Sequence, residues 1–354
     1  MNPYSPVSDC PPERWDAFLE SIPEGHFQQS SMWAEAKTIE GWEPILVTFE
    51  RDGQIRGGFQ ILTKHTRFGR IGYVSKGPAL ADEHPDLQAQ ALKSLADTSR
   101  KHGLRALIVQ APDHTRLTPG QFRELGFLPN HLINVISATL VIDVGRSREE
   151  ILAQMRRTTM LELKRAQKRG IKIREAGQND LGTFFDLMVE TCKRQETSPS
   201  PASVPAFQKL WEAFGDRLRL TLAEFEGQPV AGTVCLCFGD RVTFWKKGWS
   251  GAHRDKHPNQ MVMFEAIEWS QQHGYKRFDC AGMSRDTAES LVHGRRLSEL
   301  QKTGRDFFLL GYGGAPVLLP ESWVLIPNPL SRLVYRVAGG RPGFSQITRR
   351  MAQA

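Results

Sequence analysis

Residues 218–282 show three short apolar runs, a helical stretch and a final short strand. Polar turns at 226–228 and 239–240 separate the apolar runs, and glycine beside a polar residue in such a place is typical of β-hairpins. Apolar or small side chains (Met263, Ala266, Ile267 and Ser270) then recur at positions i, i+3, i+4 and i+7, which predicts a helix over 259–274 that ends with the pair His-Gly. A strand resumes at Lys276. The pattern predicts an antiparallel meander, a crossover helix and one further strand.

A second copy of this pattern lies earlier in the chain. Residues 44–64 predict a hairpin with its turn at 52–54, and a helix over 87–103 ends with the same His-Gly pair before a strand begins at Arg105. The two similarities occur in the same order and at nearly the same distance from their counterparts, which favours a tandem duplication. We therefore expect an α/β (α+β) protein of two similar domains, each a mixed, largely antiparallel sheet with flanking helices.

The first half carries several residues suited to chemistry. Ser30 or Ser31 can cap a short helix that holds Trp33, expected in the core, and Lys37, either a solvated lysine or a contact for an anion.

Lys76 stands in a basic, glycine-containing segment, which is either the edge of a hairpin or a loop that exposes its backbone at a substrate cleft. Asp113 follows the predicted strand 106–110. A carboxylate there suits a general base, although an aspartate in a turn is more common.

Residues 147–174 form the most charged segment of the chain. Ser147 and Glu150 have the spacing of a capping box, and we expect one amphipathic basic helix that joins the two halves. It is either a solvated linker or a patch for RNA or phosphate, and it lacks aromatic residues that could stack on bases. The residues of the candidate patch are Arg156, Arg157, Lys164, Arg165 and Lys168.

The expected domains are 1–145, closed by the apolar strand 127–143, and 146–320, which begins with the basic helix. Residues 307–319 are expected to form a strand broken by glycines. Residues 321–354 form a basic tail, which either packs back on the first domain as a helix or lies on a membrane surface.

Composition narrows the class of protein. The chain has 354 residues with 40% hydrophobic and 24% charged residues, and its net charge of +7 favours anionic partners. The five cysteines form no C-x-x-C pair and the histidines show no zinc spacing, so we expect reduced thiols, no metal and a cytoplasmic protein. No signal segment and no membrane span is expected.

These stretches together resemble the FemAB family of peptidoglycan-bridge aminoacyltransferases, which have a double GNAT-like fold. The resemblance extends over about residues 27–314. It rests on FQQSSMWAEAK, YVSKGP, the basic MRRTTMLELKRAQKRGIKI, HPNQMVMFEAIEW, HGYKRFDCAG and LGYGG, in that order.

The resemblance implies site residues. Lys37 and Arg194 align with the family's phosphate-binding lysine and arginine, and Trp245 lies where the family often has a tyrosine. Leu309 or Leu310 stands where the family commonly has a lysine. The expected catalytic residues are Asp113 and Tyr312, and the expected substrate contacts are Trp33, Lys37, Lys76, Arg194, Trp245 and Asn259.

The implied activity is transfer of an aminoacyl group from aminoacyl-tRNA to an amine of a sugar-nucleotide or lipid-linked muropeptide, with no bound cofactor and with peripheral contact to the inner membrane. One alternative is a CoA-dependent N-acyltransferase of exopolysaccharide or envelope synthesis, although residues 255–261 offer no glycine for a pyrophosphate loop. Another alternative, motivated by the missing lysine, is a non-catalytic module that binds an envelope precursor.

Overall fold

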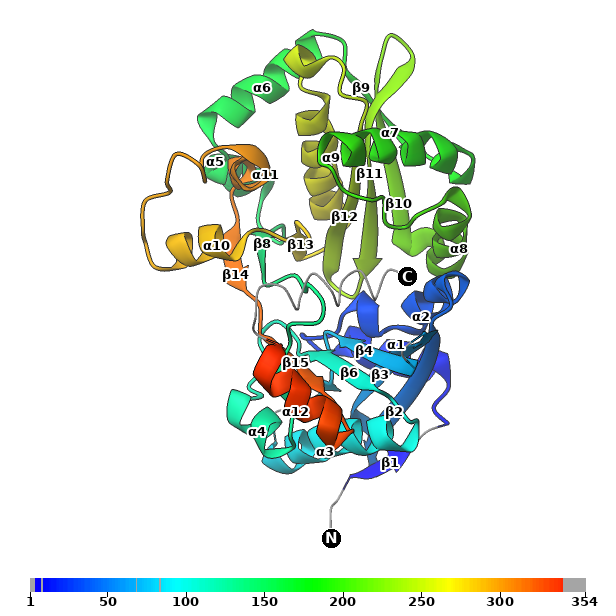
Figure 1. Ribbon diagram of the computed structural model, residues 1–354. Coiled ribbons are helices and arrows are strands. Elements are labelled where there is room, and N and C mark those ends of the chain that lie inside the picture. Colours follow the sequence, from blue (N-terminus) through cyan, green and yellow to red (C-terminus); the bar gives the residue numbers. More distant parts are fainter. Residues whose placement is uncertain (1–3, 8, 68, 83, 340–354) are drawn as a thin grey trace. The chain divides into compact units, whose positions relative to one another are not determined.

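The computed structural model describes residues 4–7, 9–67, 69–82 and 84–339, and the chain divides into two compact units (Figure 1). One unit comprises Met1–Ile136 with Leu319–Ala354, and the other comprises Ser137–Leu318. Each unit contains one sheet. The sequence predicted domain limits at 145/146 and 320/321, whereas the chain passes between the units at 136/137 and 318/319.

The first unit is built around one sheet. In chain order its strands and α-helices are β1 (Ser5–Val7), α1 (Pro12–Ser21), α2 (Ser31–Lys37), β2 (Glu43–Arg51), β3 (Gln54–Thr66), β4 (Gly69–Ser75), β5 (Ala79–Leu80), α3 (Pro85–Lys101), β6 (Ala106–Gln110), α4 (Pro119–Glu124), β7 (Leu128–Pro129), β15 (Ser322–Leu325) and α12 (Pro329–Ala338). The sheet order is β1-β2-β3-β4-β6-β15-β7, with β5 paired to β3.

The second unit follows a related plan. Its elements are β8 (Ala138–Asp143), α5 (Arg148–Gln154), α6 (Arg157–Lys168), β9 (Lys172–Ala176), α7 (Leu181–Arg194), α8 (Val204–Phe214), β10 (Leu218–Phe225), β11 (Gln228–Phe238), β12 (Arg241–Trp249), α9 (Pro258–Gln272), β13 (Arg277–Asp279), α10 (Arg285–Val292), α11 (Gly304–Leu309) and β14 (Ala315–Leu318). The sheet order is β14-β8-β13-β12-β11-β10-β9.

The predicted repeat is confirmed. In the first unit the meander β2-β3-β4 leads through α3 to β6, which lies parallel to β4, and in the second the meander β10-β11-β12 leads through α9 to β13, parallel to β12. The hairpin turns Asp52-Gly53 and Glu226-Gly227 each place two residues at positive φ, as a type I′ turn requires. Each hairpin also has an irregular register just before its turn.

The basic segment is not one helix, which corrects the sequence prediction. Helix α5 ends at Gln154, Met155 adopts an extended conformation, and α6 begins at Arg157. The break lets Met155 enter the core of the second unit and lets the Arg156 amide donate to the Gly311 carbonyl at 2.9 Å. The remainder of the segment forms the edge strand β9.

Two other predictions, for residues 307–319 and for the strand at 138–143, were also wrong. The apolar residues 307–309 belong to helix α11, and only 315–318 form a strand. Strand β8 does not close the first sheet but pairs with β13 and β14, while β15 supplies the corresponding antiparallel neighbour of β6. Apolar composition shows that a segment is buried, but it does not show which sheet receives it.

Helices α7 and α9 cover opposite faces of the meander in the second unit (Figure 1). Helix α7 approaches β12 closely at Gly248, where an added Cβ would lie 2.7 Å from the Met188 nitrogen and 2.8 Å from the Leu187 carbonyl carbon. Gly248 therefore sets the distance between α7 and β12. Within the described ranges, no helix has the length and apolar character that a membrane span needs.

We predict that Gly248→Ala destabilises the protein by about 1–3 kcal/mol, because the new methyl group would push against the backbone of α7. Urea unfolding followed by tryptophan fluorescence measures the effect. Gly182→Ala is the matched control: it lies in α7 with no atom within 4 Å of the added Cβ, and alanine there should be neutral or stabilise by up to about 1 kcal/mol. Equal unfolding midpoints for the Gly248→Ala variant and the wild type would contradict this packing.

Candidate functional site

Strands β12 and β13 pair over only part of their course. The parallel pairing runs from Arg241 to Thr243 of β12 and ends at Asp279. Asp279 is buried, lies 3.3 Å from the buried Arg241 guanidinium, and accepts a hydrogen bond from the Thr139 hydroxyl at 2.6 Å. The next residue but one, Ala281, has a positive φ of 54°. The chain therefore leaves the sheet after Asp279, while β12 continues to Trp249 without that neighbour.

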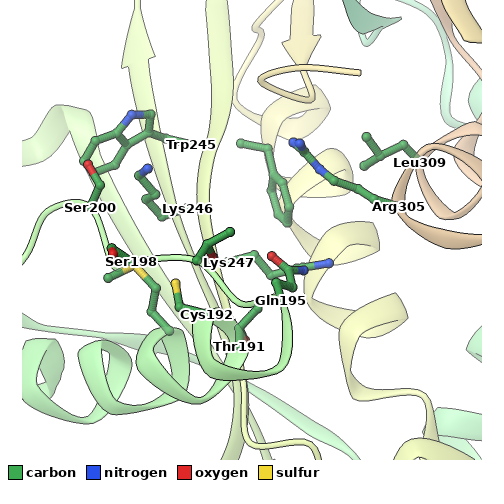
Figure 2. A pocket seen from close by; sticks show the side chains of 13 residues that line it. Thr191, Cys192, Gln195, Ser198, Ser200, Trp245, Lys246, Lys247, Arg305 and Leu309 are labelled. Carbon is green, nitrogen blue, oxygen red and sulfur yellow. The ribbon is translucent and has the colours of Figure 1, made fainter. Parts of the chain in front are cut away.

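A cavity of about 250 Å³ lies beside this part of β12 (Figure 2). Its walls come from α7 and the loop after it, from β12 and from α11. The lining residues are Met188, Thr191, Cys192, Gln195, Thr197, Ser198, Ser200, Phe244, Trp245, Lys246, Lys247, Arg305 and Leu309. None of these described lining residues is acidic, and three are basic.

A β-bulge in β12 decides which side chains reach this cavity. The register pairs Phe244 with Cys235 and Lys246 with Val234, so Trp245 has no partner on β11. A bulge reverses the alternation of faces along a strand. Lys247, paired with Thr233, therefore projects from the same face as Phe244, three residues away.

The pKa of Lys247, in the wall of the cavity, lies far below its ordinary value. Burial, and after it the positive charge of Arg305, lower the pKa of Lys247 to about 8. Its Nζ lies 4.7 Å from the centre of the Phe308 ring, and among the described residues no carboxylate forms a salt bridge with it. A partly desolvated ammonium with an aromatic face and no counter-ion is suited to an anionic group.

Arg305 is the second cation of the cavity. Its Nη2 donates to the carbonyl oxygens of Cys280 at 3.4 Å and Ala281 at 3.3 Å, directly after β13 leaves the sheet. Arg305 is therefore held at the point where the strands part, and it is exposed. Two cations that repel each other beside one cavity favour a ligand with negative charge, or a reaction in which negative charge develops.

Helix α7 supplies the polar wall opposite β12. The Thr191 hydroxyl accepts a hydrogen bond from the Trp249 amide at 2.8 Å, which ties α7 to the end of the strand. Arg194, one helical turn further, lies with its guanidinium 4.8 Å from the Trp249 ring centre and donates to the Trp249 carbonyl. Arg194 is exposed and is not a lining residue of the cavity.

The residues expected in the first unit lie at two places. Trp33 is buried against Phe27, and the Lys37 Nζ lies 4.8 Å from the Trp33 ring centre and 2.7 Å from a Glu40 carboxylate oxygen. Ser30 caps this helix, as predicted, by accepting from the Trp33 amide.

Lys76 and Asp113 form a buried ion pair with each other. Lys76 adopts a positive φ of 57° just before the Gly77-Pro78 peptide bond. The structure thus joins two residues that the sequence analysis placed in separate roles. Each satisfies the charge of the other, so the pair is suited to fixing the loop after β4 against the end of β6.

In the second unit the expected residues are spread out. Tyr312 is buried, burial raises its pKa well above the usual range, and its hydroxyl donates to the Gln260 carbonyl at 3.1 Å. Asn259 lies in the first turn of α9, with a buried Oδ1 that has no partner among the described residues. Of the residues predicted from sequence, only Trp245 lines the cavity.

The predicted basic patch is mostly solvent-facing. Arg157, Lys164, Arg165 and Lys168 on α6 are exposed. Arg156 differs from them: its guanidinium stacks 3.6 Å from the Phe307 ring centre and donates to the Phe307 carbonyl, and burial lowers its pKa.

The sequence analysis missed Lys247 and Arg305. One signal was available for Lys247, because two consecutive lysines in the apolar strand VTFWKKGW cannot both face solvent across a regular pleat. No signal marked Arg305, which reaches the cavity from helix α11; residues 307–309 of that helix were predicted to be a strand. Among the described residues no group of three or more possible metal ligands occurs. Burial also raises the pKa of the Cys237 thiol to about 11.

We predict that Lys247→Met stabilises the protein at about pH 7 by up to about 3 kcal/mol. The pKa of Lys247 is lower in the folded chain, so between about pH 8 and about pH 10.4 the unfolded chain binds more protons and stability rises with pH. The advantage of the variant should therefore shrink as pH rises through this window. Urea unfolding at both ends of the window measures it.

Lys193→Met is the control for this prediction, because Lys193 is exposed on α7 and pairs with Glu190 at 2.6 Å. It should change stability little and equally at both pH values. A Lys247→Met variant that is less stable than the wild type by the same amount at both pH values would contradict the assignment.

Each unit matches a known family model. A sequence model of the FemAB family matches residues 11–119, and a model described as an acetyltransferase (GNAT) domain matches residues 153–286. A lipid II:glycine glycyltransferase of Staphylococcus epidermidis is 23% identical, over 79% of this chain and 85% of the relative. The protein of the same name from Staphylococcus aureus is 25% identical over 51% of this chain, and the match spans 45% of that relative's length.

Solved structures agree on the fold. The crystal structure of FemX matches 95% of this chain and all of its own, with a TM-score of 0.77 and 18% identity. A tandem GNAT protein from the clavulanic acid biosynthesis pathway matches 92% of this chain with a TM-score of 0.52 and 12% identity. This chain is therefore similar to the FemAB family over residues 11–119 and to a GNAT domain over residues 153–286, and it is an acyltransferase built from two GNAT-type units.

Proposed function

We propose that this protein transfers an aminoacyl group from aminoacyl-tRNA to an amine of a peptidoglycan precursor. The observation that carries the proposal is the acid-free cavity at the parting of β12 and β13, with Lys247 and Arg305 beside it. The names of the staphylococcal relatives, lipid II:glycine glycyltransferases, suggest the class of acceptor and of acyl group.

The proposed chemistry is ester aminolysis. The amine nitrogen of the acceptor attacks the ester carbonyl carbon, a C–N bond forms and the ester C–O bond breaks. The hydroxyl of the terminal ribose leaves as the alcohol and takes up the proton that the amine releases. Negative charge develops on the carbonyl oxygen in this step, and a cation held in a partly desolvated cavity stabilises such charge more than water does. We assign this role to Lys247, with Arg305 as the second cation.

The lysine that the family commonly has at the position of Leu309 or Leu310 is absent from this chain. Leu309 lines the cavity, and Lys247 reaches the same space from β12. The positive charge that the sequence analysis found lacking at 309–310 is thus supplied from a different element. This arrangement supports an active enzyme over a non-catalytic binding module.

Two acyl donors are considered, aminoacyl-tRNA and acetyl-CoA. A CoA pyrophosphate would use the N-terminus of a helix in the position of α9. There the first-turn residue Gln260 donates to the Glu162 carboxylate at 3.2 Å, and a second anion would meet that negative charge. The exposed arginines and lysines of α6 instead suit a phosphate backbone. These contacts favour tRNA over CoA, and an acetyl-CoA donor remains the second candidate because of the GNAT domain match.

The proposed acceptor carries phosphate groups. We propose that Arg194, held in place by the indole ring of Trp249, contacts a phosphate of the precursor. A lipid-linked acceptor would place this enzyme in the cytoplasm and at the membrane surface.

The test is a transfer assay with purified protein, tRNAs charged with small amino acids, and a UDP-linked muropeptide or lipid II, with the product identified by mass spectrometry. We expect a product one aminoacyl residue heavier than the acceptor. Lys247→Met should lower kcat by about 10²–10³-fold, the usual effect of removing one charge-stabilising group. Lys193→Met, with a lysine on the outer surface of α7, is the control and should keep wild-type activity.

Two results would contradict the proposal. One is acetylation of the acceptor from acetyl-CoA with no transfer from any charged tRNA. The other is full transfer activity in the Lys247→Met variant, which would remove the cavity from the reaction while leaving the family assignment in place.

A further inference from the structure

Helix α12 is fixed to the first unit by one of its faces. Tyr335 is buried, its hydroxyl donates to the Pro129 carbonyl at 2.8 Å and accepts from the His131 amide at 2.7 Å. At the start of the helix, Arg332 donates through Nε to the Ile326 carbonyl at 2.9 Å. These contacts determine which face of α12 points away from the unit.

The outward face is apolar. Leu330, Leu333, Val334 and Val337 are 71, 59, 53 and 64% exposed. Their spacing of i, i+3, i+4 and i+7 places them in one stripe along the helix. Single exposed apolar side chains are ordinary, but four in one continuous stripe on a ten-residue helix mark an interaction surface.

The charge around the stripe indicates the partner. From Ser322 to Gly339, the described part of this segment, the sequence contains two arginines, Arg332 and Arg336, and no acidic residue. Arg336 is exposed and stands three residues after Leu333, so it lies at the border of the stripe. Aliphatic side chains bordered by arginine, on a helix without an acidic residue, complement a surface that is apolar inside and negatively charged outside.

We propose that α12 is an interfacial anchor that lies in the plane of an anionic lipid surface. The four aliphatic side chains enter the boundary between headgroups and acyl chains, and Arg336 contacts the phosphates of the headgroups. The helix is about 15 Å long, too short to cross a bilayer, and a stripe of this size gives reversible binding that depends on anionic lipid. The inference goes beyond the proposed function, since it requires neither a tRNA donor nor a particular acceptor.

Vesicle co-sedimentation tests the proposal. The full chain is mixed with sucrose-loaded vesicles of phosphatidylcholine alone or of phosphatidylcholine and phosphatidylglycerol in equal parts. The wild type should sediment with the anionic vesicles only, and less as salt is added. Leu333→Gln with Val337→Gln should lower the partition coefficient by at least about tenfold, and Arg336→Gln should weaken the preference for anionic lipid.

The matched control changes two exposed aliphatic side chains elsewhere, Val292→Gln with Leu300→Gln, which are 49 and 83% exposed. This variant should bind vesicles as the wild type does. All variants alter exposed side chains, so thermal unfolding should match the wild type, and transfer to a water-soluble precursor should be unchanged.

Three outcomes would overturn the proposal. The first is equal vesicle binding by the α12 variant and the control variant. The second is binding to neutral and anionic vesicles alike. The third is a wild type that fails to bind vesicles but is a dimer by light scattering, with Leu333→Gln and Val337→Gln making it a monomer, which would assign the stripe to a second copy of the chain.

Discussion

The candidate site depends on the point where β13 leaves β12. The buried Arg241–Asp279 pair fixes this point, since Asp279 also accepts from the Thr139 hydroxyl and from the Ala281 amide. Removing one partner of such a pair leaves an uncompensated buried charge and typically costs about 3–5 kcal/mol. With the strands apart, β12 has one edge free of its parallel neighbour, and the cavity occupies that edge. The bulge at Trp245 then turns Lys247 toward it. Fold and chemistry are thus coupled through a few residues near the end of one strand.

The two units use one plan for different purposes. In the first unit β4 is the counterpart of β12, and the loop after β4 carries Lys76, whose charge is neutralised by Asp113. In the second unit Lys247 has burial and a neighbouring arginine but no carboxylate salt bridge among the described residues. A paired lysine stabilises a loop, whereas an unpaired one retains its capacity to interact with a ligand. This difference is why we place the reaction in the second unit and treat the Lys76–Asp113 pair as a positioning element.

Local features of the fold could be predicted from the sequence, but pairings between distant segments could not. The turns at Gly53 and Gly227 and the helix stops at Gly103 and Gly274 were recognised because glycine at positive φ is a local requirement. The sequence did not reveal that β8 pairs in the second sheet and β15 in the first, because strand pairing depends on distant partners. Lys247 was missed because a bulge reverses the faces of β12, and two-residue alternation cannot reveal where the reversal occurs.

The measurement that tests the central claim most directly uses a short acceptor-stem RNA that ends in a non-hydrolysable 3′-aminoacylamide. Calorimetry measures its binding to the wild type and to the Lys247→Met variant. The account predicts saturable binding to the wild type, weakened at least about tenfold by the substitution, with a steep salt dependence from phosphate contacts. CoA should not compete. Binding of CoA that displaces the RNA analogue, or RNA binding that is indifferent to Lys247, would contradict the assignment of this cavity to the aminoacyl end of the donor.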